Sequence, residues 1–318
     1  METMIEVSGL SRSFDEIQAV CDLSFKVKKG ELLGFLGPNG AGKSTTMKML
    51  TCFLTPSSGT AKIGGFDIIE QPEEVRSIVG YLPENAPLYG EMRVCDFLSF
   101  VARVRSLNGS KEKSAIDRVI DSTSLEEVLD RRIETLSKGF KRRVGLAQAI
   151  IHDPSVLILD EPTDGLDPNQ KHEVRKLIKS MARDKCIVLS THILEEVDAV
   201  CTRAIIIAHG RLLADGTPAQ LRRKVDTRDL FVLQVPEGIA TQAQEKLASQ
   251  SFIRELRLSE TVPGKNDLLE LVPEGRSPEA LQKTLNMLSD LQIPVMDLHL
   301  RGGQLDEVFR NITMSPLS

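Results

Sequence analysis

The chain has 318 residues, of which 41% are hydrophobic and 27% are charged, values typical of a globular protein with room for two domains. Its net charge of −5 argues against a nucleic-acid binder. No run reaches the ~18 apolar residues of a membrane-spanning helix, and the first residues do not resemble a signal peptide. The five cysteines are scattered and odd in number, which favours a reducing compartment.

The N-terminal part of the chain predicts strands around one helix. "MIEVSGL" (4–10) and "VCDLSFKV" (20–27) alternate apolar and polar residues, as half-exposed strands do. "ELLGFLG" (31–37) predicts a buried strand, and "KSTTMKMLTCFL" (43–54) predicts a helix directly after it. Two further strands are predicted in "TAKIGGFDI" (60–68) and "SIVGYLP" (77–83).

The middle of the chain is mostly helical between about Glu84 and Glu134, and another helix is predicted in "FKRRVGLAQAII" (140–151). "SVLILD" (155–160) and "CIVLST" (186–191) are short, nearly all-apolar strands of the kind buried in a parallel sheet. The other predicted elements are two helices, "NQKHEVRKLIKSMARD" (169–184) and "ILEEVDAVC" (193–201), and a hairpin, "RAIIIAHGRLLADG" (203–216).

The sequence pattern changes after "DGTPAQLRRK" (215–224), and we place a domain boundary near Arg222. The segments from 229 to 300 predict the order βαββαβ, which resembles a small split-βαβ unit. A last helix is predicted in "QLDEVFRNIT" (304–313). This part carries no catalytic constellation, so an accessory role is expected.

A phosphate-binding loop follows the buried strand at 31–37. "GPNGAGKST" matches G-x-x-x-x-G-K-[ST] between a strand and a helix, which is the context that the motif requires. The glycines allow a tight turn whose N–H groups face phosphate oxygens. Lys43 is expected to reach the β- and γ-phosphates, and Ser44 to ligate Mg²⁺. The nucleotide-binding residues predicted here are Gly37, Pro38, Asn39, Gly40, Ala41, Gly42, Lys43, Ser44 and Thr45.

Two carboxylates stand at the end of the strand at 155–160. Asp160 occupies the place of a Mg²⁺-binding aspartate at the end of an apolar strand, and Glu161 follows it into the same site. Glu161 can act as a general base toward a water that attacks the γ-phosphate. An acidic loop at a sheet edge is the alternative, which the phosphate-binding loop in the same chain disfavours.

His192 follows the strand "CIVLS", and strands of such a sheet deliver residues to the ligand crevice at their carboxyl ends. Its imidazole could hydrogen-bond a γ-phosphate. A lone histidine at a strand end is more often structural, so the sequence by itself leaves both interpretations open.

Four cations surround a helix start in "LSKGFKRR" (136–143), where the helix dipole favours an anion. A helix repeats every ~3.6 residues, so Lys141, Arg142 and Arg143 should point in different directions. At least one of them is expected on a solvated face.

The motifs "GPNGAGKST", "LSKGF", "VLILDEPT", "GLDP" and "STH", in this order, resemble the ATPase subunit of ABC transporters over about Ile5 to Gly216. "GYLPENAPLYGEM" and the terminal "LDEVF" are similar to bacterial stand-alone subunits of the drug-export and gliding-motility type. The resemblance implies an α/β P-loop NTPase fold in residues 1–222. This fold has a RecA-like parallel sheet, an antiparallel β subdomain and a helical subdomain at about 84–140. An α+β ferredoxin-like domain at 223–318 would follow.

The resemblance also implies roles for single residues. Phe14 matches the aromatic residue that stacks on adenine, although one phenylalanine after a strand also fits a core. Ser137 and Gly139 match the signature loop, and Asp167 matches a carboxylate at a dimer interface. His192 matches the switch histidine. The implied metal ligands are Ser44, Asp160 and Glu84, the implied catalytic residues are Lys43, Glu161 and His192, and the implied cofactors are ATP and Mg²⁺.

Three residues depart from the family pattern. The signature is usually LSGGQ, and here Lys138 and Phe140 replace a glycine and the glutamine. Glu84 stands where the family usually has glutamine. Both side chains offer an oxygen to Mg²⁺ or its waters, and the glutamate adds negative charge near a γ-phosphate.

The resemblance implies ATP hydrolysis by two copies that pack head to tail around two ATP molecules. The dimer would drive a separate integral membrane permease, an exporter, from the cytoplasmic face of the inner membrane, with no nucleic acid involved. A soluble ABC ATPase of translation or DNA repair is the alternative, disfavoured by a single phosphate-binding loop and by the absence of sustained heptads. A small-molecule kinase would leave "LSKGF" and "STH" unexplained. The transported substrate is not readable from this chain.

Overall fold

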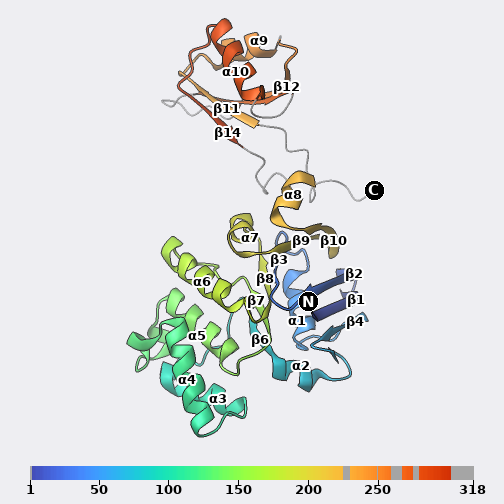
Figure 1. Cartoon of the computed structure of the whole chain (residues 1–318), viewed down its shortest axis with the longest axis vertical. Helices are drawn as coiled ribbons and strands as arrows, with labels where there is room; N and C mark the ends of the chain where they lie inside the picture. Colours follow the sequence, from blue (N-terminus) through green and yellow to red (C-terminus); the bar gives the residue numbers. More distant parts are fainter. Residues whose placement is uncertain (1, 225–229, 249, 259–266, 275–278, 302–318) are drawn as a thin grey trace. The chain divides into compact units, whose positions relative to one another are not determined.

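The computed structural model describes residues 2–224, 230–248, 250–258, 267–274 and 279–301 (Figure 1). The chain forms two compact units, Met1–Pro218 and Ala219–Ser318. The boundary that we place near Arg222 falls within α8 (Pro218–Lys224). Among the residues that the structure describes, no helix combines the length and the apolarity needed to cross a membrane.

A six-stranded sheet forms the centre of the first unit, in the order β10-β9-β3-β8-β7-β6. The strands from β9 to β6 pair in parallel, and β10 pairs antiparallel to β9. Every residue of β3, β7 and β8 is buried, which explains their nearly all-apolar sequences. The strand bounds are β3 (Leu32–Leu36), β6 (Val79–Leu82), β7 (Val156–Asp160), β8 (Cys186–Thr191), β9 (Arg203–Ala208) and β10 (Arg211–Gly216).

An antiparallel sheet in the order β2-β1-β4-β5 packs against the central one. Its alternating sequence places Ile5, Val7 and Leu10 in a shared core with residues of β3, β7 and β8. Phe25 of this sheet meets Phe35 of β3 at 5.7 Å between ring centroids. The bounds are β1 (Thr3–Phe14), β2 (Ile17–Lys28), β4 (Ser58–Ile63) and β5 (Phe66–Asp67).

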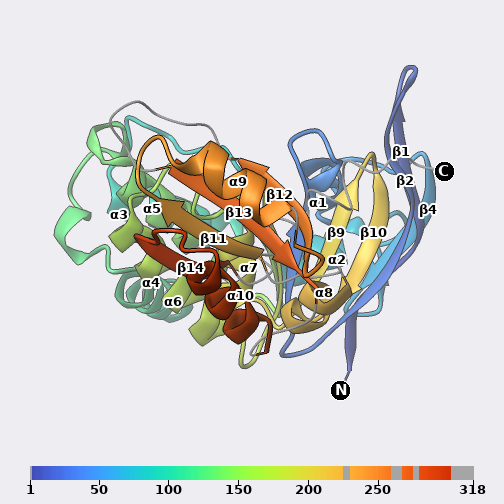
Figure 2. The ribbon, with the colours of Figure 1, turned by 90° about the horizontal axis from the view of Figure 1, so that it is seen from above.

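A helical region lies at the opposite end of this unit from β1, β2 and β4 in both views (Figures 1 and 2). It contains α3 (Val94–Val104), α4 (Ser110–Thr123) and the start of α5 (Lys138–Ile150). Two short 3₁₀ turns, Glu126–Val128 and Ile133–Thr135, connect α4 to α5. The buried residues of α3 recur at helical spacing and pack with those of α4 and α5 in one core. The other helices are α1 (Lys43–Leu50), α2 (Pro72–Ile78), α6 (Pro168–Met181) and α7 (Leu194–Val200).

Several predicted helix ends were wrong; α6, for instance, ends at Met181 rather than at 184. Two of these errors have a clear local cause. α1 ends at Leu50 rather than at 54, because Cys52 takes a left-handed φ of 56° and Phe53 N donates back to Lys48 O. This pattern is a common way for a helix to end. α5 begins at Lys138, two residues before the predicted start, because the Ser137 hydroxyl caps it. The sequence pattern also missed α2 and α8.

The second unit has an antiparallel sheet in the order β12-β13-β11-β14. α9 (Ala240–Ala248) and α10 (Glu279–Asp290) pack through Leu247 and Leu288 onto the face that carries Phe231, Leu233 and Leu269. The predicted βαββαβ order is therefore confirmed, and the sheet order is that of a ferredoxin-like fold. The helix predicted at 304–313 lies outside the described residues. The strand bounds are β11 (Leu230–Val235), β12 (Ile253–Leu258), β13 (Asp267–Pro273) and β14 (Asp297–Arg301).

Candidate nucleotide-binding site

The loop from Gly37 to Gly42 joins β3 to α1 and fits closely against neighbouring backbone. A Cβ on Gly37 would lie 2.5 Å from Ile207 O, and one on Gly42 would lie 2.4 Å from Ala19 O. Gly42 also has a φ of 102°, which disfavours any other residue. α1 has no acidic residue in its first turn. The loop and the helix start therefore present N–H groups in the manner of an anion site.

The Lys43 side chain is buried and reaches back over this loop. Its Nζ donates to Gly37 O at 2.8 Å and to Pro38 O at 3.2 Å, and it lies 3.6 Å from Glu161 Oε1. Burial lowers the pKa of the Lys43 ammonium, and the nearby Glu161 carboxylate opposes that shift. The lysine thus brings a positive charge to the end of β7.

Ser190 of β8 organises the two carboxylates at the end of β7. Its hydroxyl donates to Asp160 Oδ1 and accepts from Glu161 N at 3.1 Å. Glu161 N also donates to Ser190 O at 3.2 Å, although Glu161 has a left-handed φ of 48°. Asp160 is buried, whereas the Glu161 side chain is 12% exposed. One neighbouring strand therefore fixes the Asp160 carboxylate and the backbone of Glu161.

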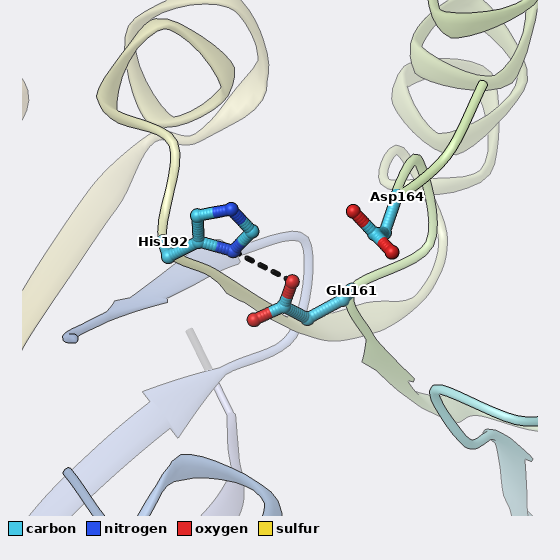
Figure 3. A group of neighbouring side chains, drawn as sticks. All are labelled: Glu161, Asp164 and His192. Atoms are coloured by element: carbon cyan, nitrogen blue, oxygen red, sulfur yellow. Dashed lines mark hydrogen bonds and ion pairs between the residues drawn. The ribbon is translucent and has the colours of Figure 1, made fainter. Parts of the chain in front are cut away.

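His192 and Asp164 meet Glu161 at the open side of the site (Figure 3). His192 Nδ1 and Glu161 Oε2 are hydrogen-bonded at 2.7 Å. The Asp164 carboxylate joins them, and ligand atoms of the three residues lie within 4.8 Å of one another. Sequence reasoning missed Asp164. The available signal was its position three residues after Glu161, where a turn with Asp164 N bonded to Glu161 O folds it back.

A cavity of about 630 Å³ opens above these groups. Phe14, which is 41% exposed, lies on the wall of this cavity. The Arg12 guanidinium lies over the Phe14 ring, 4.7 Å from the ring centre. The structure brings most of the predicted nucleotide-binding and catalytic residues together here. The predicted residues on the wall are Phe14, Asn39, Gly40, Gly42, Lys43, Ser44, Thr45, Glu84, Glu161 and His192.

The predicted metal ligands lie at this cavity or directly beneath it. Ser44 and Glu84 line the wall, and buried Asp160 ends β7 with one oxygen fixed by Ser190. All three donors are oxygens, which is the ligand type that Mg²⁺ prefers. The donor set therefore fits the predicted cation.

Seven predicted residues do not line this cavity. Gly37, Pro38 and Ala41 belong to the phosphate-binding loop itself, and Asp160 ends the buried strand β7. The other three, Ser137, Gly139 and Asp167, lie at the starts of α5 and α6. Ser137 caps α5 by accepting from Phe140 N at 3.3 Å. Asp167 caps α6 by accepting from Gln170 N at 2.9 Å, and a Cβ on Gly139 would meet the Gln170 side chain at 2.6 Å. The starts of α5 and α6 therefore form one surface outside the chain's own cavity.

The Lys138 ammonium lies beside Gly165 of the same chain, 3.9 Å from where a Cβ on that glycine would be. It lines a second cavity, of about 460 Å³, together with Asp164 and Arg142. The Arg142 guanidinium is directed into the protein and donates to the carbonyls of Glu84 and Pro162. Sequence reasoning did not single out Arg142, because helical spacing alone does not say which cation faces inward.

The strand, phosphate-binding loop, helix and paired carboxylates define a P-loop nucleotide-binding protein. The sequence model described as ABC transporter matches residues 20–164. A relative named as an uncharacterized ABC transporter ATP-binding protein of Bacillus subtilis is 31% identical over 92% of this chain and 99% of its own length. The chain belongs to the ABC transporter ATP-binding protein family.

Other similar proteins agree with this assignment. The daunorubicin/doxorubicin resistance ATP-binding protein of Streptomyces peucetius is 31% identical over 98% of this chain and 93% of its own length. The solved structure of an ATP-binding subunit of an ABC transporter has a TM-score of 0.64 at 32% identity, covering 70% of this chain and 92% of that one. These names favour transport over the alternative of translation or DNA repair.

Replacement of Ser190 by alanine should weaken Mg²⁺-dependent nucleotide binding. Without the Ser190 hydroxyl the Asp160 carboxylate is no longer held in one orientation, and ordering it on binding costs about 1 kcal/mol, so affinity should fall roughly 5-fold. Titration of a fluorescent ATP analogue with Mg²⁺ and with EDTA measures this loss. Binding in EDTA should change little, and Ser180→Ala, at an exposed serine of α6, is the matched control. Wild-type Mg²⁺-nucleotide affinity in Ser190→Ala would contradict the role given to Ser190.

Proposed function

We propose that this chain binds and hydrolyses ATP with Mg²⁺, and that two copies pack head to tail to drive a separate membrane permease. The observation that supports the proposal is that the predicted site residues lie in two separate places on the chain's surface. The phosphate cradle and the catalytic carboxylate share one cavity, whereas the signature residues Ser137 and Gly139 lie outside it.

The nucleotide would occupy the cavity above the phosphate-binding loop. Arg12 covers one side of the exposed Phe14 ring, and the rest of that ring faces the cavity as a stacking surface for adenine. The phosphates would follow the loop N–H groups to Lys43. Mg²⁺, held by Ser44 and Asp160 with Glu84 nearby, would neutralise phosphate charge.

Lys43 and Glu161 partly neutralise each other at 3.6 Å. A γ-phosphate would compete for the Lys43 ammonium, which would free the Glu161 carboxylate to accept a proton from the attacking water. His192 already donates to the other oxygen of Glu161. It would therefore orient this base and lie where it could contact the γ-phosphate.

The start of α5 carries the signature residues, which do not line the chain's own nucleotide cavity. Gly139 is buried, Ser137 caps the helix, and the first turn contains no acidic residue. Such a helix start favours an anion. In a two-fold dimer, the anion would be the γ-phosphate held by the other copy, with Asp167 at the same interface.

The permease would be an integral membrane protein on another chain, so this subunit would lie peripherally on the cytoplasmic face of the inner membrane. Exposed apolar side chains of the helical region support a docking surface there: Val104 is 65% exposed, and Tyr89 lies 5.6 Å from Phe100 between ring centroids. The name of the Streptomyces peucetius relative, a daunorubicin/doxorubicin resistance ATP-binding protein, supports an exporter.

Glu161→Gln should bind ATP but hydrolyse it at least ~100-fold more slowly, because the amide keeps the shape and loses the base. ATP should then accumulate at the interface and give a dimer in size-exclusion chromatography. Glu73→Gln, at an exposed glutamate of α2, is the charge-matched control and should behave as wild type. Normal turnover by Glu161→Gln would show that Glu161 is not the base.

Ser137→Arg should bind ATP like the wild-type monomer, because Ser137 lies outside the chain's own cavity. It should block hydrolysis and ATP-dependent dimerisation, because the bulky side chain would occupy the place of the partner's γ-phosphate. Nucleotide titration and phosphate release measure the two effects separately. Ser114→Arg, on an exposed face of α4, controls for the added charge. Loss of nucleotide binding by the Ser137→Arg monomer would count against a role across the interface.

A further inference from the structure

The Arg142 side chain is placed unlike that of its neighbours on α5. A guanidinium has five N–H donors in a rigid plane, and here all five donate to backbone carbonyls. Nη1 donates to Pro83 O at 3.0 Å and Glu84 O at 2.7 Å, Nε to Pro162 O at 2.9 Å, and Nη2 to Asp160 O at 2.6 Å and to Glu161 O.

These carbonyls belong to the ends of two adjacent parallel strands. The β6–β7 ladder runs from Val79–Val156 to Leu82–Leu159 and ends there. Arg142 binds the residues that come next on both strands. It therefore continues the connection between the two chain segments beyond the last ladder pair.

The two segments carry the groups that face the nucleotide cavity. Glu161 has a left-handed φ of 48°, a conformation that persists for a non-glycine residue only when its surroundings fix it. Ser190 fixes its N–H, and Arg142 fixes its carbonyl. Arg142 also holds the carbonyl of Glu84, whose side chain lines the same cavity.

The charge of Arg142 suits this position as well. Four carboxylates surround it, from Glu84, Asp160, Glu161 and Asp164, and they oppose the effect of burial, which lowers its pKa. Two of these four are unexpected: Glu84 departs from the family's glutamine, and sequence reasoning missed Asp164. A half-buried cation bonded to carbonyls offsets this negative charge without occupying the nucleotide cavity.

We propose that Arg142 is a positioning residue for hydrolysis, which holds the Glu84 and Glu161 segments to α5 through its five-donor contact. The inference rests on the proposed ATPase function. It adds a direct link within one chain. The start of α5 would contact the ATP of the other copy, and the same helix is bonded through Arg142 to the loop that carries Glu161 of its own chain. A lysine cannot reproduce the contact, because an ammonium has three donors and no planar fork.

Arg142→Gln and Arg142→Lys test this role against the control Arg143→Gln. Arg143 is on the same helix, and its guanidinium lies over Phe140. Both Arg142 variants should lower kcat roughly 10- to 100-fold, the scale of loss expected when a reacting group shifts by about 1 Å. KM and monomer nucleotide affinity should change less than about 2-fold, since Arg142 does not line the nucleotide cavity. Arg143→Gln should retain wild-type kcat.

Hydrogen exchange of the full-length chain without nucleotide gives a second readout. In both Arg142 variants, exchange should speed up at Glu84–Asn85 and Glu161–Asp164, with α1 and the phosphate-binding loop unchanged. Wild-type kcat in Arg142→Lys would show that charge alone suffices and would overturn the proposal. Faster exchange throughout residues 2–218 would show a general folding role and would also overturn it. If the wild-type chain does not hydrolyse ATP, the proposed function fails, while the exchange result still decides whether Arg142 fixes the two segments.

Discussion

The site depends on the parallel alignment of β3, β7 and β8, whose carboxyl ends meet at one edge of the central sheet. Leu36 pairs with Thr191, and Asp160 pairs with Ser190. The phosphate-binding loop, the two carboxylates and His192 all follow directly from these ends. The three strands are buried throughout, so packing fixes their register. The polar groups at their carboxyl ends are therefore held in fixed positions relative to one another.

Around this edge, positive and negative side chains contact one another, and a bound nucleotide would compete for these contacts. Lys43 lies between loop carbonyls and Glu161, and His192 holds the other Glu161 oxygen. Behind them, Arg142 bonds to the backbone of the carboxylate segments. Lys138, the cation at the start of α5, lies against Gly165 of its own chain. In the proposed dimer, the start of α5 would therefore attract an anion through Ser137, backbone N–H groups and the helix dipole.

Much of this could be predicted from the sequence, because the motifs are local and the central strands are nearly all apolar. The parts that could not be predicted depend on tertiary contacts. Whether Arg142 or Arg143 points inward is decided by the position of the β6 and β7 ends, not by helical spacing. Asp164 reaches the site through a turn, and α1 ends early through a backbone bond to Lys48. Neither event leaves a strong sequence pattern.

The central claim is that each phosphate cradle is completed by Ser137 of another copy. Mixing Ser137→Arg with Glu161→Gln tests it directly, since neither variant alone should hydrolyse ATP. In a mixed dimer, the cradle of the Ser137→Arg copy would meet the intact signature of the Glu161→Gln copy. The mixture should therefore regain phosphate release that neither variant shows alone, up to about a quarter of the wild-type rate, which is the limit for random pairing because half of the dimers would contain one intact site of two. No recovery in a mixture in which differently tagged copies of the two variants are shown to form mixed dimers with ATP would contradict the account.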